Sequence, residues 1–162
     1  MEAWLPTRNR LRRLGSGPKH QLVDPALAAR LLGIGPDALL QGVDSDPVIP
    51  RDGTLLGSLF ESLVTLDVRV YAQAAEADVK HLRTASGEHE VDLIVERPGG
   101  HGVLAIEVKL ASVIDDTDLN HLTWLKRRIG DDLLDAVVVT TGTTAYRRPD
   151  GIGVVPAALL GA

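Results

Sequence analysis

The chain contains no cysteine. This absence excludes disulfide bonds, zinc sites with thiolate ligands and a cysteine nucleophile, and it fits a reducing compartment. Aromatic residues make up only 3% of the sequence, so a core must be built mainly from Leu, Val, Ile and Ala. No apolar run approaches the roughly 20 residues of a membrane-spanning helix, and none follows the basic N-terminal residues as in a secretory signal. We therefore expect a cytoplasmic protein with no membrane partner.

Several catalytic and nucleotide-binding motifs are also missing. The segment 15–20 has glycines and a lysine, but it lacks the spacing, the Ser or Thr and the preceding strand of a phosphate-binding loop, so we expect no ATP binding by this chain. The five histidines show no metal-ligand spacing, and no serine lies in a nucleophile-elbow pattern. No pattern indicates an oligomeric state.

What is present is enough apolar sequence for one domain and an uneven distribution of charge. The chain has 162 residues, 44% of them hydrophobic, and a net charge of −5. Residues 1–20 hold five basic residues against one acidic residue, a balance of +4 that leaves −9 for the rest. A basic arm can contact nucleic-acid phosphates, but such a run is more often a solvated chain end. We interpret residues 1–17 as a basic irregular lead-in and residues 18–162 as one domain.

Hydrophobic periodicity and turn residues predict the order of helices and strands. We expect short helices at 26–32 and 36–40, a long helix capped by Asp52 or Thr54 and ending near residue 77, strands near 79–84, 89–96 and 102–110, a helix at 116–129, strands at 135–141 and 152–155, and a helical turn at 156–160. The helical connection after the third strand is long enough to make that strand and the next one parallel. The predicted fold is α/β, with a mixed β-sheet flanked by helices.

Acidic residues occur on both sides of a predicted hairpin turn at 96–102, which contains consecutive glycines. Glu90 and Asp92 point to the same face of their strand, and Glu107 and Lys109 point to the same face of the next strand. A symmetric turn places Asp92 opposite Glu107 and Glu90 opposite Lys109. Two facing carboxylates repel each other, and a divalent cation would compensate for this repulsion. Since a neighbouring lysine can help to activate a water molecule, the spacing favours a hydrolytic site for phosphodiesters.

The same spacing also fits a solvent-facing strand surface. In that interpretation, Glu90 and Lys109 form only a cross-strand ion pair. The opposite face of the strand, with Val91, Leu93 and Val95, is then the buried one. Spacing alone leaves both interpretations open.

Glu61 interrupts an apolar stretch of the long helix, one turn after Gly57 and Ser58. Small residues at this point allow the helix to approach a sheet closely. Glu61 is therefore either a third acid that reaches the Asp92 and Glu107 pair, or a partly exposed helix glutamate.

Three motifs follow one another along the chain: Gly57-x-x-Phe60-Glu61, Glu90-Val91-Asp92 and Ile106-Glu107-Val108-Lys109. Together they resemble the PD-(D/E)xK nuclease superfamily. Two further segments, Gly17-Pro18-Lys19 followed by 23–27 and Gly151-Ile152-Gly153 followed by 154–160, are similar to the uncharacterised domain that lies C-terminal to the ATPase module in many bacterial and archaeal AAA-type ATPases. This resemblance covers the chain from about residue 17 onward.

The resemblance implies a restriction-endonuclease-like core and a set of roles. Asp92 and Glu107 would hold Mg²⁺ or Mn²⁺, with the Val108 carbonyl as a further ligand and Glu61 as the acid from the helix. Lys109 would position or deprotonate the attacking water, and DNA would be the substrate.

This chain departs from the resembled pattern in two respects. Val91 stands where the superfamily name has proline, and the ATPase module and winged-helix segment of the usual relatives are missing. Two functions follow as expectations: a metal-dependent nuclease acting on DNA, or a catalytically inactive nuclease-fold module that binds nucleic acid or a protein.

Overall fold

A computed structural model of the chain describes residues 1–4, 17–41, 55–84 and 87–161. Most of the predicted basic arm, including Arg8, Arg10, Arg12 and Arg13, lies outside these ranges, as do both predicted caps of the long helix. The helices are α2 (Pro25–Leu31), α3 (Pro36–Gln41), α4 (Leu55–Ala74) and α5 (Asn120–Ile129), with short 3-10 turns at Thr117–Leu119, Gly130–Asp132 and Ala157–Leu159. The strands are β1 (Asp78–Arg83), β2 (Glu90–Glu96), β3 (Val103–Val108), β4 (Leu133–Thr140), β5 (Tyr146–Arg147) and β6 (Gly153–Pro156).

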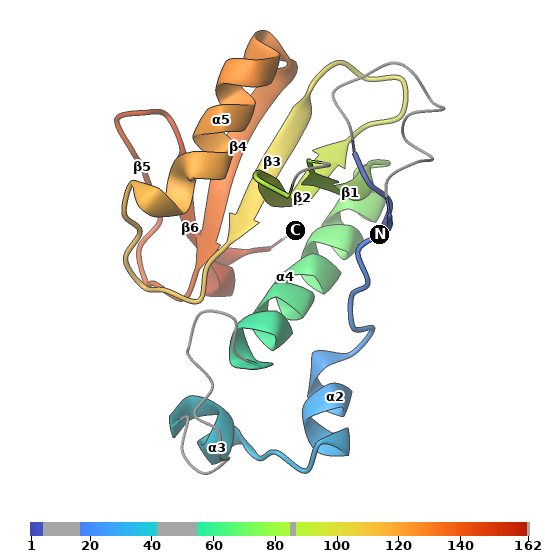
Figure 1. The fold of residues 1–162 in the computed structure, drawn as a ribbon, viewed down its shortest axis with the longest axis vertical. Helices are drawn as coiled ribbons and strands as arrows, with labels where there is room; N and C mark the ends of the chain where they lie inside the picture. The colour runs from blue at the N-terminus through green and yellow to red at the C-terminus, as the bar shows by residue number, and fades with distance from the viewer. Residues whose placement is uncertain (5–16, 42–54, 85–86, 162) are drawn as a thin grey trace.

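The strands form one mixed sheet in the order β1-β2-β3-β4-β6-β5 (Figure 1). The pairs β1–β2 and β2–β3 are antiparallel, whereas β3–β4 and β4–β6 are parallel. The expected α/β fold and the parallel pairing through α5 are therefore confirmed. The strand β5 was not predicted, because two exposed residues are too few to form an alternating pattern.

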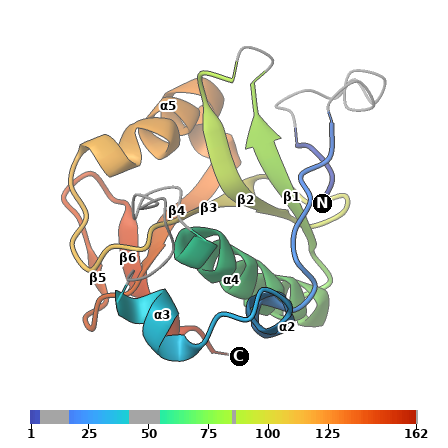
Figure 2. The same cartoon turned by 60° about the horizontal axis from the view of Figure 1, so that its bottom comes forward.

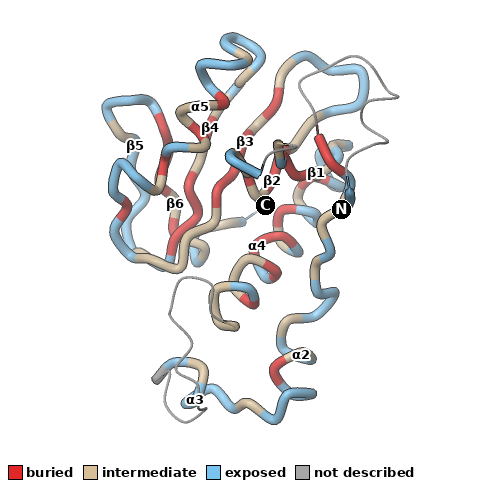
Figure 3. Tube along the Cα trace, in the orientation of Figure 1, coloured by how far each residue is buried: buried red, intermediate tan, exposed pale blue. Residues whose placement is uncertain are grey.

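Helices cover both faces of the sheet (Figure 2). Leu122 and Leu125 of α5 are fully buried in the core on one face, and Val64 and Val68 of α4 are buried in the core on the other. Helices α2 and α3 contact α4. Buried segments follow the central strands and recur along α4, while α2 and α3 remain largely exposed (Figure 3). None of the helices in the described ranges is long and apolar enough to cross a membrane.

The hairpin between β2 and β3 has the predicted register. Leu93 pairs with Ile106, and Glu96 pairs with Val103. Gly102, in the turn, has a φ of +81° that favours glycine. The predicted pairing continues in register only as far as Leu93, where the regular ladder between β2 and β3 ends.

A register shift in β2 changes which residues share a face. Lys80 of β1 pairs with Ile94, but Leu82 pairs with Val91, so two residues of β2 lie opposite one residue of β1. This is the arrangement of a β-bulge, which reorients the side chains around it. Val91 therefore packs in the α5-side core, whereas Leu93 packs in the α4-side core. The prediction that Val91 and Leu93 share one buried face was wrong for this reason.

Residues 2–4 lie along the free edge of β1. Ala3 forms a parallel bridge with His81, and the Trp4 amide donates a hydrogen bond of 2.6 Å to the His81 carbonyl. The Trp4 ring is buried in the α5-side core, and its Nε1 donates to Glu96 Oε2 at 2.7 Å. The start of the chain thus belongs to the folded unit.

Candidate functional site

Asp92 lies where β2 separates from β3. Its Oδ2 accepts a hydrogen bond of 2.9 Å from the Val108 amide, beyond the last regular pair of the two strands. The carboxylate therefore takes the place of a strand carbonyl and fixes its own orientation. Only 14% of the side chain is exposed.

Glu107 lies on β3 beside Asp92 and is almost fully buried. Its Oε1 is 3.2 Å from Lys109 Nζ, whereas its Oε2 is buried and has no hydrogen-bond partner within the described part of the chain. The Lys109 amide donates to the Val139 carbonyl at 2.9 Å, so the backbone beyond β3 still follows β4. The structure thus brings Asp92, Glu107 and Lys109 together, as the hairpin register predicts.

Burial and neighbouring negative charge raise the proton affinity of both carboxyl groups. Burial and then the charge of Asp92 raise the pKa of Glu107 to about 8. Burial also raises the pKa of Asp92, and the nearby charge of Glu61 acts in the same direction. Without a bound cation, at least one of the pair is therefore protonated near neutral pH. This is the behaviour that two facing carboxylates predict.

A second lysine neutralises the remaining acids. Lys19 Nζ lies 2.9 Å from Glu61 Oε1, 3.0 Å from Glu90 Oε1 and 3.2 Å from Asp92 Oδ1. Burial lowers the pKa of Lys19, but the charges of Asp92 and Glu61 outweigh this effect and raise the pKa above its ordinary value. Glu61 on α4 thus approaches Asp92 through a shared ammonium group.

The predicted ion pair between Glu90 and Lys109 was wrong. Glu90 pairs with Lys19 and, at 3.9 Å, with Arg83, whereas Lys109 pairs with Glu107. The physical reason is that the ladder between β2 and β3 begins only at Leu93, so Glu90, which precedes it, does not face the end of β3.

Contacts of the segment around Lys19 hold the ammonium group in place. The backbones of Met1 and Lys19 exchange two hydrogen bonds, of 2.9 and 3.0 Å. Two residues further on, Gln21 Nε2 donates to Glu61 Oε1 at 2.7 Å and its Oε1 accepts from Ser62 Oγ at 3.1 Å. Sequence reasoning missed the role of Lys19. The only indication was its place in residues 17–27, here called the entry segment, which resemble part of the ATPase-associated domain.

Aromatic rings adjoin the acidic residues on the α5 side. His89 stacks on Trp124 with ring centroids 4.2 Å apart, and His121 meets His89 edge-on at 5.7 Å. Burial lowers the pKa of His121, and the charges of Lys109 and His89 lower it further. His121 is therefore neutral near pH 7, and His89 has a packing role against Trp124.

A magnesium ion fits part of this arrangement. The described ranges contain no group of three or more His, Asp or Glu side chains arranged to bind a metal. Mg²⁺ is commonly bound through only one or two carboxylates, together with water and substrate phosphate. Asp92 and Glu107 supply such a pair, and the partnerless Glu107 Oε2 is a buried hard oxygen. Glu61, the third predicted ligand, is engaged by Lys19 and Gln21.

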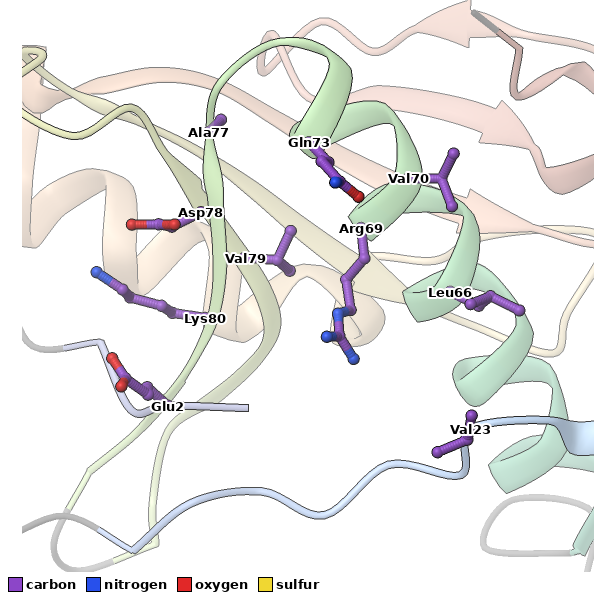
Figure 4. Close-up of a pocket in the computed structure, with 10 residues that line it drawn as sticks. All are labelled: Glu2, Val23, Leu66, Arg69, Val70, Gln73, Ala77, Asp78, Val79 and Lys80. Atoms are coloured by element: carbon purple, nitrogen blue, oxygen red, sulfur yellow. The ribbon is translucent and has the colours of Figure 1, made fainter.

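A pocket of about 700 Å³ lies elsewhere, between α4, β1 and the N-terminal residues. Figure 4 shows Arg69 extending from α4 into this space, with Glu2 and Lys80 on the opposite wall. The acids around Lys19 and Lys109, here called the acidic cluster, are Glu61, Glu90, Asp92 and Glu107. None of them lines this pocket, so the pocket adds nothing to that site.

The fold and these contacts define a mixed α/β domain with clustered acids and two lysines where the antiparallel and parallel parts of its sheet meet. Residues 56–160, more than half of the chain, match the family described as a domain of unknown function (DUF4143), and the chain belongs to this family. No curated protein and no solved structure matches the chain. The matched range includes Glu61, Asp92, Glu107 and Lys109 but not Lys19.

Proposed function

We propose that this chain hydrolyses phosphodiester bonds in DNA with the help of Mg²⁺ or Mn²⁺. The observation that carries the proposal is the buried pair of carboxyls at the end of β3. Glu107 keeps an oxygen without a partner and has a pKa raised to about 8, beside Asp92 and within 3.2 Å of Lys109. Such an arrangement is costly in a purely structural role, because an unsatisfied buried acid destabilises the fold. Strongly perturbed carboxyls of this kind concentrate at functional sites.

In this proposal, each residue has a distinct task. Asp92 and Glu107 would hold the cation, and the Val108 amide keeps Asp92 in a fixed orientation. A bound divalent ion would stabilise the negative charge that develops on the phosphate. Lys109 would orient the attacking water and assist its deprotonation, since its ammonium group adjoins Glu107.

The motif order supports this assignment. Glu61, Asp92, Glu107 and Lys109 follow one another as in the PD-(D/E)xK superfamily that the sequence resembles. The wider resemblance to the domain of AAA-type ATPases suggests that the chain acts beside an ATPase module, and this context is part of the proposal.

The test is cleavage of single- and double-stranded DNA by the purified chain, with Mg²⁺ or Mn²⁺ and with EDTA. We expect cleavage only with the metal, and a loss of about 100-fold or more in Glu107→Ala and in Lys109→Ala. Lys109→Ala should keep the rise in melting temperature that the metal causes in wild type, and Glu107→Ala should lose it. Asp131→Ala, an exposed acid outside the site, is the matched control. Wild type that cleaves neither DNA with either metal would contradict the proposal.

A second candidate is a catalytically inactive module that binds nucleic acid or a protein. The contacts of Lys19 favour it, because they neutralise three acids without a metal. In that case wild type cleaves no DNA, and any DNA binding it has is unaffected by EDTA and by Glu107→Ala.

A further inference from the structure

The oxygens of Asp92 are both occupied in the folded chain. Oδ2 accepts from the Val108 amide at 2.9 Å, and Oδ1 accepts from Lys19 Nζ at 3.2 Å. Glu61 Oε1 is similarly shared between Lys19 and Gln21. A cation that used Asp92 would therefore share an oxygen with one of its present donors.

We infer that Lys19 is a built-in cation that occupies the acidic cluster, and that a divalent ion binds at Asp92 only by displacing it. This inference rests on the proposed metal site, and it adds a residue of the entry segment that controls access to that site. Of the two donors on Asp92, the Val108 amide belongs to the end of β3. Lys19 belongs to an irregular segment, so it is the donor that can leave.

Electrostatic repulsion disfavours binding of both cations to the same oxygen. Mg²⁺ binds oxygen at about 2.1 Å, and the Lys19 ammonium lies 3.2 Å from the same Oδ1. An ammonium and a divalent ion on one oxygen would repel strongly in this half-buried place. The side chain of Lys19 is 22% exposed, and its flexible stem allows the ammonium group to move into solvent.

Displacement of Lys19 would be transmitted along its segment. Among the described residues, the ammonium group holds this segment together with the backbone pairing of Lys19 with Met1 and the contacts of Gln21 with Glu61 and Ser62. Metal binding is thus coupled to a loosening of the contacts between residues 19–21 and helix α4. The ammonium group also removes carboxylate repulsion when no metal is bound, so it supports the metal-free fold.

Lys19→Met tests this inference without any measurement of cleavage. Free Mn²⁺ is measured by electron paramagnetic resonance during titration of wild type, Lys19→Met and Lys80→Met. Lys80 is a matched control, because it is also a poorly exposed lysine, paired with Glu96 away from the cluster. We expect Lys19→Met to bind Mn²⁺ about tenfold more tightly than wild type, since a competing charge is removed. Lys80→Met should bind it as wild type does.

Melting without metal supplies a second expectation. Lys19→Met should melt at a lower temperature than wild type in EDTA, and Mn²⁺ should raise its melting temperature by more than it raises that of wild type. Equal or weaker Mn²⁺ binding by Lys19→Met than by wild type would overturn the inference.

Wild type alone provides a further measurement if Lys19→Met does not fold. Nuclear magnetic resonance of the lysine ammonium groups follows Lys19 while Mg²⁺ is added. The Lys19 resonance should move to the position of a solvated lysine at the same Mg²⁺ concentrations that shift the carboxyls of Asp92 and Glu107. A Lys19 resonance that stays unchanged at saturating Mg²⁺ would overturn the inference. None of these three readouts involves cleavage, so failure of the nuclease proposal and failure of this inference are separate results.

Discussion

The Glu107 carboxyl is an expensive group to bury. It lies beside the carboxyl of Asp92, and one of its oxygens has no partner among the described residues. The ion pair with Lys109 offsets only part of this cost, because burial and the charge of Asp92 still leave the pKa at about 8. A residue of this kind makes the stability of the whole domain depend on pH.

The direction of this dependence follows from linkage. The folded chain holds the Glu107 proton up to about pH 8, whereas the unfolded chain releases it near the ordinary value of 4.5. The contribution of Glu107 is therefore fully present below pH 4.5 and is lost as the pH rises towards 8, at up to about 1.4 kcal/mol per pH unit. Glu107→Gln lacks this loss, so its free energy of unfolding should rise relative to wild type between pH 5 and pH 8. Urea unfolding in EDTA measures this difference.

Glu90 provides a control of opposite sign. Burial raises its pKa, but the bond to Lys19 outweighs burial and lowers it. The stability that Glu90 contributes is therefore present above its ordinary pKa and is lost as the pH falls through the lowered value. Glu90→Gln should lose stability relative to wild type near neutral pH.

The interpretation of Glu107 would be contradicted if the difference in free energy of unfolding between Glu107→Gln and wild type were the same at pH 5 and pH 8.

At the scale of single elements, the hairpin of β2 and β3 depends on glycines with different surroundings. Gly99 and Gly102 both have positive φ, of +73° and +81°. A Cβ on Gly99 would meet no atom within 4 Å. A Cβ on Gly102 would lie 2.7 Å from the Leu134 side chain and 2.9 Å from the Asp132 carbonyl. The turn at Gly102 is thus packed against the start of β4 and the residue just before it.

This difference predicts unequal effects of alanine. Gly99→Ala should lower the free energy of unfolding by about 1 kcal/mol, the cost of a left-handed conformation. Gly102→Ala should lower it by about 2–4 kcal/mol, because steric overlap with backbone and side chain is added. Urea unfolding of both variants measures these losses. Equal losses in free energy of unfolding would show that Leu134 and Asp132 move aside at no cost.

The hairpin also shows how far sequence reasoning reaches. Its register followed from a symmetric glycine turn, and the parallel pairing of β3 with β4 followed from the length of the connection. The bulge that moves Val91 to the other face was beyond this reasoning, since one extra residue leaves no mark in composition. The contact of Lys19 with Asp92 joins residues 73 positions apart, and no periodicity links them. Only the acids and the lysine of the hairpin were close enough in sequence for their meeting to be predicted.

At the scale of the whole molecule, the sheet changes character at β3. The neighbour on one side, β2, is antiparallel to β3, and the neighbour on the other side, β4, is parallel to it. Asp92 comes from the antiparallel part, Glu107 from β3 itself, and the Lys109 amide bonds to β4. The acidic site therefore depends on both parts of the sheet, and α4 and the entry segment complete it with Glu61 and Lys19.

The two outer strands of this sheet differ in their protection. β5 has only two residues, whereas β1 has six. Residues 2–4 cover the outer side of β1 through the bridge of Ala3 to His81. Long uncovered outer strands are templates for pairing between molecules. We expect deletion of residues 1–4 to cause concentration-dependent aggregation, detected by light scattering. Trp4→Phe, which keeps the backbone cover, should lower the melting temperature without aggregation. A deletion variant that stays monodisperse would show that other residues protect β1. Aggregation of the deletion variant would show that a few N-terminal residues control the colloidal behaviour of the chain by covering one strand edge.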